Sequence, residues 1–379
     1  HCMSGRGEVL HQLIVRQVEE MAGQFLGKGC QEELAAGQCF FFVVGNTAMS
    51  HLFLNKSAEG LAGYPFHPAY QGNYWCTGKE IGMERFGEAG ICVLSGIAAH
   101  VGGDALAVIG AEQLYGKEKI QLAVDLGTNA EIILNCRGNI MACSTAAGPA
   151  FEGKGISCGM AAKSGAVSEV KIAAGNGNII LGVLEGEKAA GLCSSGLIDL
   201  LAQLRGCGLL LKDGYLLGQA EAEAAGITAE LCRRLVTCNG QNAFLLCGEK
   251  EGAKEICLQQ SDIRSLQLAK AAIQAGIISI LEAAGLTLKE IDEFIVAGVL
   301  GSCMKQKSAI DIGLFPESAS TCIHLAGNAA GKGAVIGVLD SSFASSMEKL
   351  AKEVLHIEIA QEKGFQERLM KAMDIQRWL

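Results

Sequence analysis

The sequence is poor in proline and in aromatic residues, and its apolar runs are short. It has 4 prolines, 50 glycines and 5% aromatic residues among 379 residues. This composition argues against a fibrous or disordered chain and favours an α/β protein with many tight turns. Gly, Ser or charged residues interrupt the apolar runs well before the roughly 20 residues of a transmembrane helix, so we expect no membrane partner.

Charge of one sign is not concentrated anywhere in the sequence. The net charge is −9, and the acidic and basic residues are spread along the chain. A nucleic-acid partner would need a basic patch, so we expect none. No basic segment followed by an apolar one opens the sequence. Nothing therefore argues for export, and we expect a cytoplasmic protein.

Cysteine is abundant, but the spacing of a metal centre is missing. The 16 cysteines form no Cys-x-x-Cys pair and no short run typical of an iron–sulfur or zinc site. Many lie in apolar stretches, as Cys39 does beside Phe40. We expect buried, reduced thiols in a reducing compartment, and a redox cluster within the chain is the alternative.

A glycine turn between two apolar runs is the most informative feature present. Asp125 follows the run 120–124, and Gly127 and Thr128 precede a second run, 130–134. The pattern predicts a strand, a tight turn and a returning strand. Such a turn suits a phosphate with magnesium, because glycine exposes N–H groups, threonine can donate, and aspartate can hold Mg²⁺ through water. A plain β-hairpin is the alternative.

Two upstream turns have a functional and a structural interpretation each. Asn46 and Thr47 follow the predicted strand 40–44 and either present N–H groups to an anion or cap the next helix. Asp104 follows two glycines and is either a second carboxylate near the phosphates or an N-cap. His51 is expected to be a packed helix residue.

Two downstream segments also combine glycine with hydroxyl side chains. Residues 144–153 are so rich in small residues that close approach to a ligand or another chain is expected. The predicted strand 294–297 runs into Gly298, Gly301 and Ser302. Glycines at such a strand-to-helix turn let a purine or ribose lie on the backbone. Tight packing of a helix on a sheet is the alternative.

Helical spacing marks several further segments. Residues 8–27 predict an amphipathic helix, and Asp262 is expected to cap a long helix with a buried apolar stripe. His324 is expected to begin an Ala/Gly helix able to pack closely on a neighbour.

The order of the motifs matches a superfamily of ATPases. The turn at Asp125 resembles the phosphate loops of actin, sugar kinases and heat-shock chaperones, and a strand ending in Gly-x-x-Gly-Ser follows a long insertion. No second Asp-x-Gly-Thr turn lies between residues 126 and 294. Asp125 is therefore assigned to the second phosphate motif, and the first is expected upstream of His1. We expect a fragment or an N-terminally trimmed chain.

The motifs together resemble one family, the ATP-dependent reductive activators of corrinoid (cobalamin) proteins in anaerobic methyl-transfer systems. The resemblance covers nearly the whole chain, and its most specific part is Ser-Thr-Ala-Ala-Gly-Pro-Ala-Phe-Glu-Gly at 144–153. The segments that carry it are residues 45–51, 101–104, 125–131, 144–153, 159–160, 194–199, 261–264 and 327–331.

This resemblance implies an α/β fold of the bilobal, actin-like (ribonuclease H-like) class without its first phosphate hairpin. It implies a first lobe at 1–118, a second at 119–340 with an inserted subdomain near 205–260, and a helical and stranded tail at 341–379. It also implies an ATPase that helps to return Co(II) corrinoid proteins to Co(I). A corrinoid protein is the expected partner, and a homodimer the expected assembly.

The resemblance also assigns roles to single residues. Asp125 would position Mg²⁺, and Asp104 and Glu131 would orient the attacking water or the metal. ATP or ADP would lie against Gly127, Thr128, Asn129, Gly148, Gly298, Gly301 and Ser302. Full-length members usually carry an N-terminal plant-type [2Fe–2S] domain, for which this sequence has no cysteine cluster.

Two other functions are compatible with the same sequence. One is an activator ATPase of 2-hydroxyacyl-CoA dehydratases, in which cysteines of a dimer hold a [4Fe–4S] cluster. The other is a docking module for a corrinoid protein, in which nucleotide sets the conformation without being hydrolysed.

Overall fold

The chain packs as two compact units. The computed structural model describes residues 6–26, 39–173, 175–186, 188–248, 252, 254–298, 300 and 304–378. Unit 1 consists of His1–Lys119, Asn135–Cys143 and Asn328–Ile357, and unit 2 consists of Ile120–Leu134, Ser144–Gly327 and Glu358–Leu379.

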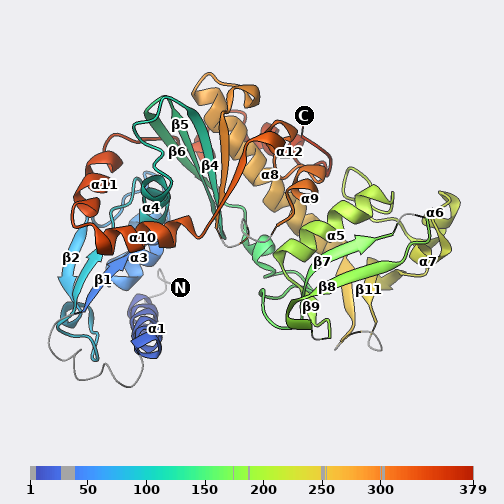
Figure 1. The fold of residues 1–379 in the computed structure, drawn as a ribbon, viewed down its shortest axis with the longest axis horizontal. Helices are drawn as coiled ribbons and strands as arrows, with labels where there is room; N and C mark the ends of the chain where they lie inside the picture. The colour runs from blue at the N-terminus through green and yellow to red at the C-terminus, as the bar shows by residue number, and fades with distance from the viewer. Residues whose placement is uncertain are drawn as a thin grey trace. The chain divides into compact units, whose positions relative to one another are not determined.

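A six-stranded sheet contains the strand that ends at Asp125. Its strand order is β14-β13-β4-β5-β6-β15. Figure 1 labels β4, β5 and β6 of this sheet. Strand β13 pairs in parallel with both β4 and β14, and β15 pairs in parallel with β6. The strands are β4 (Ile120–Leu126), β5 (Ala130–Cys136), β6 (Asn139–Thr145), β13 (Glu293–Ala297), β14 (Ile323–Gly327) and β15 (Leu355–His356).

The predicted hairpin is confirmed, since β4 and β5 are neighbours in the sheet, and a second turn returns the chain from β5 to β6. Between β5 and β6, Arg137 and Gly138 have φ values of 53° and 94°. Two consecutive positive φ values give the backbone twist that a two-residue hairpin favours. The side chain of Asn135 accepts a hydrogen bond from the Gly138 N–H at 2.8 Å and so stabilises the turn.

The rest of unit 2 comprises the segment inserted between β6 and β13, together with later helices. Its strands form two three-stranded sheets, β8-β7-β9 and β10-β11-β12. The strands are β7 (Ala166–Ile172), β8 (Ile179–Val183), β9 (Gly191–Leu192), β10 (Leu235–Cys238), β11 (Gln241–Cys247) and β12 (Ile256–Gln259). The helices are α5 (Ser194–Gly206), α6 (Gln219–Ala224), α7 (Ala229–Cys232), α8 (Gln260–Ala283), α9 (Gln306–Asp311) and α12 (Phe365–Lys371).

Helix α8 is the central helix of unit 2. It is long and apolar enough to cross a membrane by length and composition, but 78% of that apolar window is buried within the fold. A Cβ atom at Gly276 would lie 2.5 Å from the side chain of Ile132, so glycine lets the helix lie close to β5. The prediction that Asp262 is the N-cap of α8 was wrong, because Gln259 is the N-cap. The Asp262 side chain lies in the first turn and accepts a hydrogen bond from the Gln259 N–H at 2.9 Å.

Unit 1 is built on a three-stranded sheet with the order β1-β3-β2. One hydrophobic core includes Val15 of the predicted first helix together with Phe53 and Ile91. The strands are β1 (Phe40–Val43), β2 (Tyr74–Thr77) and β3 (Gly90–Val93). The helices are α1 (Gly7–Leu26), α3 (Thr47–Phe53), α4 (Gly103–Ala111), α10 (Ala329–Leu339) and α11 (Phe343–Ala351).

Helix α10 packs closely through its glycines, as predicted. A Cβ atom at Gly333 would lie 2.4 Å from the carbonyl oxygen of Ala107, and one at Gly337 would lie 2.4 Å from the ring of Phe42. The predicted start of this helix at His324 was wrong. Residues 323–327 form β14, and the Asn328 side chain caps the helix by accepting from the Gly331 N–H at 2.9 Å.

Candidate functional site

The candidate phosphate turn joins two buried strands. Six of the seven residues of β4 are buried, whereas Gly127 and Thr128 in the turn are exposed. The Gly127 N–H donates to the Asn129 carbonyl at 3.0 Å, which closes the turn. The side chain of Asp125 is partly exposed at the end of β4. The turn therefore exposes the backbone at Gly127 and Thr128 at the end of a buried strand, next to the partly exposed Asp125.

The structure brings Gly298 to this turn. Ala297 is the ladder partner of Asp125 in the parallel pair β13–β4, so the two strands end side by side. Gly298 has a φ of +90°, and a Cβ atom there would lie 2.5 Å from the Leu126 carbonyl oxygen and 3.1 Å from Oδ1 of Asp125. Only glycine fits this position without strain. The predicted phosphate turn and the first residue of the predicted adenosine motif are therefore neighbours at the carboxyl ends of two parallel strands, where α/β sheets commonly bind ligands.

Two of the predicted adenosine residues, Gly301 and Ser302, lie outside the described residues. Gly148 is described, with a φ of 76°, and precedes the short helix η5 (Pro149–Glu152). Its role in binding nucleotide stays a prediction.

Glu152 is a further acidic residue beside the turn. The Thr128 hydroxyl donates to Oε1 of Glu152 at 2.5 Å, and Nζ of Lys154 donates to Oε2 at 2.8 Å. Burial raises the pKa of Glu152, but the hydrogen bonds from Lys154 and Thr128 outweigh it and hold that pKa below its ordinary value. Sequence patterns alone did not mark this residue as functional, although it lies near the end of the specific motif 144–153.

The two other predicted catalytic carboxylates have different surroundings. Glu131 on β5 is buried and accepts a hydrogen bond from the Ser144 hydroxyl at 3.3 Å. Asp104 is in the first turn of α4, accepts from the Ala105 N–H at 2.9 Å, and has its pKa raised by burial. Asp104 belongs to unit 1 and the phosphate turn to unit 2, so a role for Asp104 at the phosphates stays a prediction.

Asn46 caps helix α3, which is one of the two predicted interpretations of this turn. Oδ1 of Asn46 accepts from the Met49 N–H at 2.9 Å, and the Thr47 hydroxyl donates to the Ala98 carbonyl at 3.0 Å. His51 is packed as predicted, since its ring nitrogens bond to the Thr47 carbonyl at 2.7 Å and the Ala69 N–H at 2.8 Å. Accepting the Ala69 N–H requires a neutral ring, and burial lowers the His51 pKa accordingly.

Comparison with known proteins identifies the family. A family model described as the C-terminal domain of RACo, the ASKHA domain, matches residues 119–378. The chain belongs to this family. A second model, described as the RACo middle region, matches residues 2–117.

Two curated relatives support the family assignment. The corrinoid activation enzyme RamQ of Eubacterium limosum is 30% identical over 372 residues, which are 97% of this chain and 61% of RamQ. The [Co(II) methylated amine-specific corrinoid protein] reductase of Methanosarcina barkeri is 27% identical, over 94% of this chain and 65% of the reductase. The chain thus spans less than two thirds of the length of each.

A solved structure supports the RACo fold as well. A reductive activator for corrinoid,iron-sulfur protein superposes with a TM-score of 0.87 at 29% identity, over 98% of this chain and 57% of that one. The predicted α/β, actin-like fold class is therefore confirmed.

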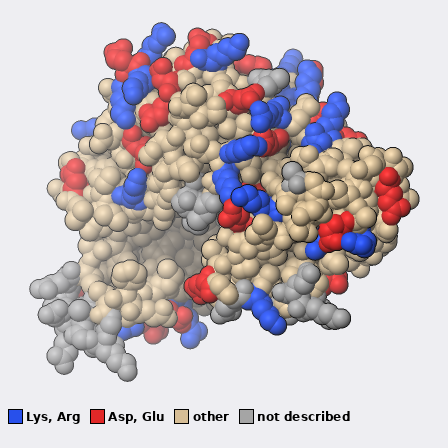
Figure 2. Space-filling view, turned by 45° about the vertical axis from the view of Figure 1, so that its right-hand side comes forward, with Lys and Arg blue, Asp and Glu red and all other residues tan. Residues whose placement is uncertain are grey.

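The charged surface of this RACo-family chain is mixed. On the face that Figure 2 shows, Lys and Arg side chains alternate with Asp and Glu side chains.

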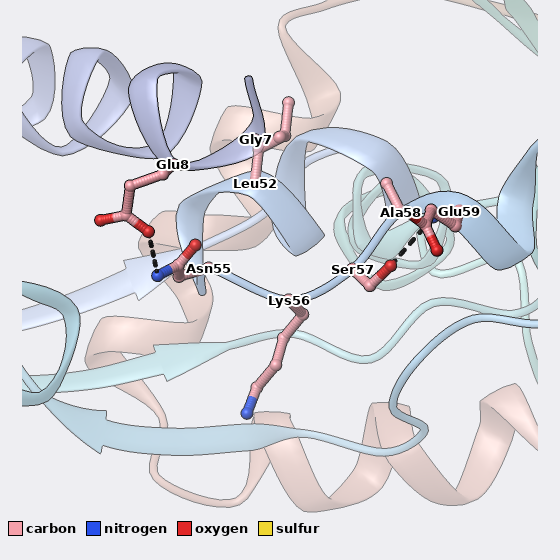
Figure 3. Close-up of a pocket in the computed structure, with 8 residues that line it drawn as sticks. All are labelled: Gly7, Glu8, Leu52, Asn55, Lys56, Ser57, Ala58 and Glu59. Carbon is pink, nitrogen blue, oxygen red and sulfur yellow. Dashed lines mark hydrogen bonds between the residues drawn. The ribbon is translucent and has the colours of Figure 1, made fainter. Parts of the chain in front are cut away.

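A small hollow in unit 1 contains none of the predicted site residues. It has a volume of about 170 Å³, and residues 7–8, Leu52 and 55–59 line it (Figure 3). Its polar groups bond to one another, since Asn55 donates to Glu8 at 3.0 Å and the Glu59 N–H donates to Ser57 at 3.3 Å. The Lys56 ammonium lies 4.9 Å from the centre of the Tyr74 ring. These side chains do not converge on a ligand.

Proposed function

We propose that this chain is the nucleotide-binding part of an ATP-dependent reductive activator that helps to return Co(II) corrinoid proteins to Co(I) in anaerobic methyl-transfer systems. The observation that carries the proposal is the meeting of Asp125 and Gly298 at the ends of β4 and β13. Membership of the RACo family and the names of its relatives support the corrinoid partner.

The exposed groups of the turn suit a magnesium nucleotide. Carboxylate and hydroxyl oxygens are the ligand type that Mg²⁺ prefers, and it usually keeps several waters. In the proposed arrangement Asp125 would hold Mg²⁺ through water, while the N–H groups of Thr128 and Asn129 would face phosphate oxygens. The bound ion would supply charge neutralisation at the phosphates. The chain's own contribution is positioning, which provides most of the catalysis in phosphoryl transfer.

Other parts of the site follow from the same proposal. Adenosine lies against the backbone at Gly298, with Gly301, Ser302 and Gly148 as further contacts. Asp104 and Glu131 orient water or the metal. The proposal also includes the division into a first lobe at 1–118, a second at 119–340 and a tail at 341–379.

The partners and setting of this activator are part of the proposal. A homodimer in the cytoplasm docks a corrinoid protein, and a [2Fe–2S] domain outside this chain supplies the electron.

Calorimetric binding of Mg·ATP and Mg·ADP tests the proposal. We expect binding by the unmodified chain and a loss of at least about tenfold in affinity for Asp125→Ala, which equals about 1.4 kcal/mol. Asp213→Ala is the matched control, because the side chain of this exposed aspartate accepts a local hydrogen bond from the Tyr215 N–H at 3.0 Å, and its longer-range hydrogen bonds are made by the carbonyl oxygen that alanine keeps. No binding by this chain or by a version extended upstream would contradict the ATPase assignment.

A second measurement separates the activator from its alternatives. ATP turnover that rises when the Co(II) corrinoid protein is added supports the activator. Binding without turnover would favour the docking module, and stoichiometric iron in an anaerobically purified dimer would favour the dehydratase-type activator.

A further inference from the structure

The hydroxyl of Thr128 is already committed as a hydrogen-bond donor. A hydroxyl has one proton to donate and two lone pairs that accept. Thr128 donates that proton to Oε1 of Glu152 at 2.5 Å. An ionised carboxylate has no proton, so the direction of this hydrogen bond is set by the charge of Glu152.

Two features keep Glu152 ionised and in position to accept the hydrogen bond from Thr128. The Lys154 ammonium donates to the other carboxylate oxygen at 2.8 Å, which favours the ionised form. The short helix η5 is anchored by Phe151, which is 5% exposed, and is followed by Gly153, whose φ is 74°. A Cβ atom at Gly159 would lie 2.0 Å from the Gly153 carbonyl oxygen, so the backbone is tightly packed here. The position of Glu152 is therefore set by the fold.

The consequence concerns what Thr128 can bind. Phosphate oxygens are acceptors, and a hydroxyl whose proton is used elsewhere has nothing to donate to them. Its oxygen can still accept from a metal-bound water or coordinate a cation. Asp125 lies three residues before Thr128, near the end of β4, and is partly exposed.

We propose that Glu152 is a positioning residue that takes up the Thr128 proton, so that the Thr128 oxygen serves hydrated Mg²⁺ beside Asp125 and does not donate to phosphate. This inference rests on the proposed nucleotide site and deepens it. It also replaces the expectation that the hydroxyl donates to the nucleotide.

The test compares ADP binding by calorimetry with Mg²⁺ and with a chelator present. The ratio of the two affinities measures how strongly magnesium and ADP are coupled. Glu152→Gln removes the charge and offers an amide donor to Thr128, which frees the threonine proton for phosphate. We expect the magnesium coupling to fall at least about tenfold, while ADP binding with the chelator stays equal or becomes tighter.

Substitutions at Thr128 separate positioning from a structural role. Thr128→Val should lose the same coupling, and the double variant Thr128→Val with Glu152→Gln should lose no more than either single variant. Thr128→Ser keeps the hydroxyl and should retain the coupling. Glu223→Gln is the matched control, since that glutamate is exposed and accepts from Gln219 one helical turn away at 2.9 Å.

The outcomes distinguish this inference from the function on which it rests. Magnesium-dependent ADP binding that Glu152→Gln leaves unchanged would overturn the inference alone. Losses of ADP affinity that are equal with and without magnesium, and additive in the double variant, would assign Glu152 a structural role. This result would also overturn the inference. Absence of ADP binding by the unmodified chain would overturn the proposed function, and the inference would fail with it.

Discussion

The Lys305 ammonium donates to the buried carboxylate of Asp199 at 2.8 Å. Asp199 is 2% exposed and also accepts from the Ser308 hydroxyl at 2.6 Å and from the Val170 N–H at 3.3 Å. This interaction ties the start of α9, just after the predicted adenosine motif, to helix α5. The sequence motif 194–199 ends on this aspartate. Its position in the motif did not by itself indicate a structural role.

We predict that Asp199→Ala lowers the free energy of unfolding by about 2 kcal/mol or more. The variant would leave the Ser308 hydroxyl and the Val170 N–H without their charged acceptor, and a buried donor without a partner costs about 1–3 kcal/mol. The control is Glu169→Ala, because Glu169 also pairs with Lys305 but 48% of its side chain is exposed. An exposed ion pair contributes about 1 kcal/mol or less. Urea denaturation measures both variants, and equal losses would contradict the prediction.

Gly298→Ala should destabilise the fold and weaken nucleotide binding. The φ of +90° strains any other residue, and the new Cβ would contact the Leu126 carbonyl oxygen. We expect a loss of at least about 1 kcal/mol in the free energy of unfolding. Gly206→Ala is the matched control, since nothing lies within 4 Å of its Cβ position in α5. Alanine there should stabilise the helix by up to about 1 kcal/mol. Thermal denaturation and ADP calorimetry measure both.

Lys270 on α8 makes the stability depend on pH. Its side chain is buried, Nζ donates to the Asp374 carbonyl at 2.7 Å, and burial lowers its pKa from 10.5 to about 8. Between these two values the unfolded chain binds more protons than the folded one, so folding is increasingly favoured as the pH rises. Below pH 8 the cost of the buried charge is fully present.

Comparison with Lys270→Met isolates this contribution. The free energy of unfolding of the unmodified chain should rise relative to the variant from pH 8 to 10.5, by at most about 1.4 kcal/mol per pH unit. Urea denaturation at several pH values measures the difference. A constant difference across this range would contradict the prediction.

The buried thiols should resist alkylation in the folded chain. Burial raises the pKa values of Cys92, Cys158 and Cys257 to about 12. Because the thiolate is the nucleophile, iodoacetamide at pH 8 should modify these residues only after denaturation. Partly exposed thiols such as that of Cys136 should react before these three. Mass spectrometry of peptides from folded and denatured samples measures the order, and early modification of Cys158 would contradict the prediction.

Local patterns were sufficient for most helices, strands and turns. The apolar runs around the turn at Asp125 predicted β4 and β5, because strand periodicity and glycine turns depend on neighbouring residues alone. The predicted start of α10 at His324 was wrong. The short segment 324–327 forms part of β14 because it pairs with β13. No local pattern distinguishes such a strand from a helix start.

Consecutive residues were enough to predict the family, the turn at Asp125 and the glycine at 298. Which distant groups meet at this turn follows from the folded chain. It placed Gly298 beside Asp125 through strand pairing and directed the Thr128 proton to Glu152 through the packing of η5. Such contacts depend on the register of strands and on side chains that lie far apart in the chain, and spacing along one sequence does not encode them.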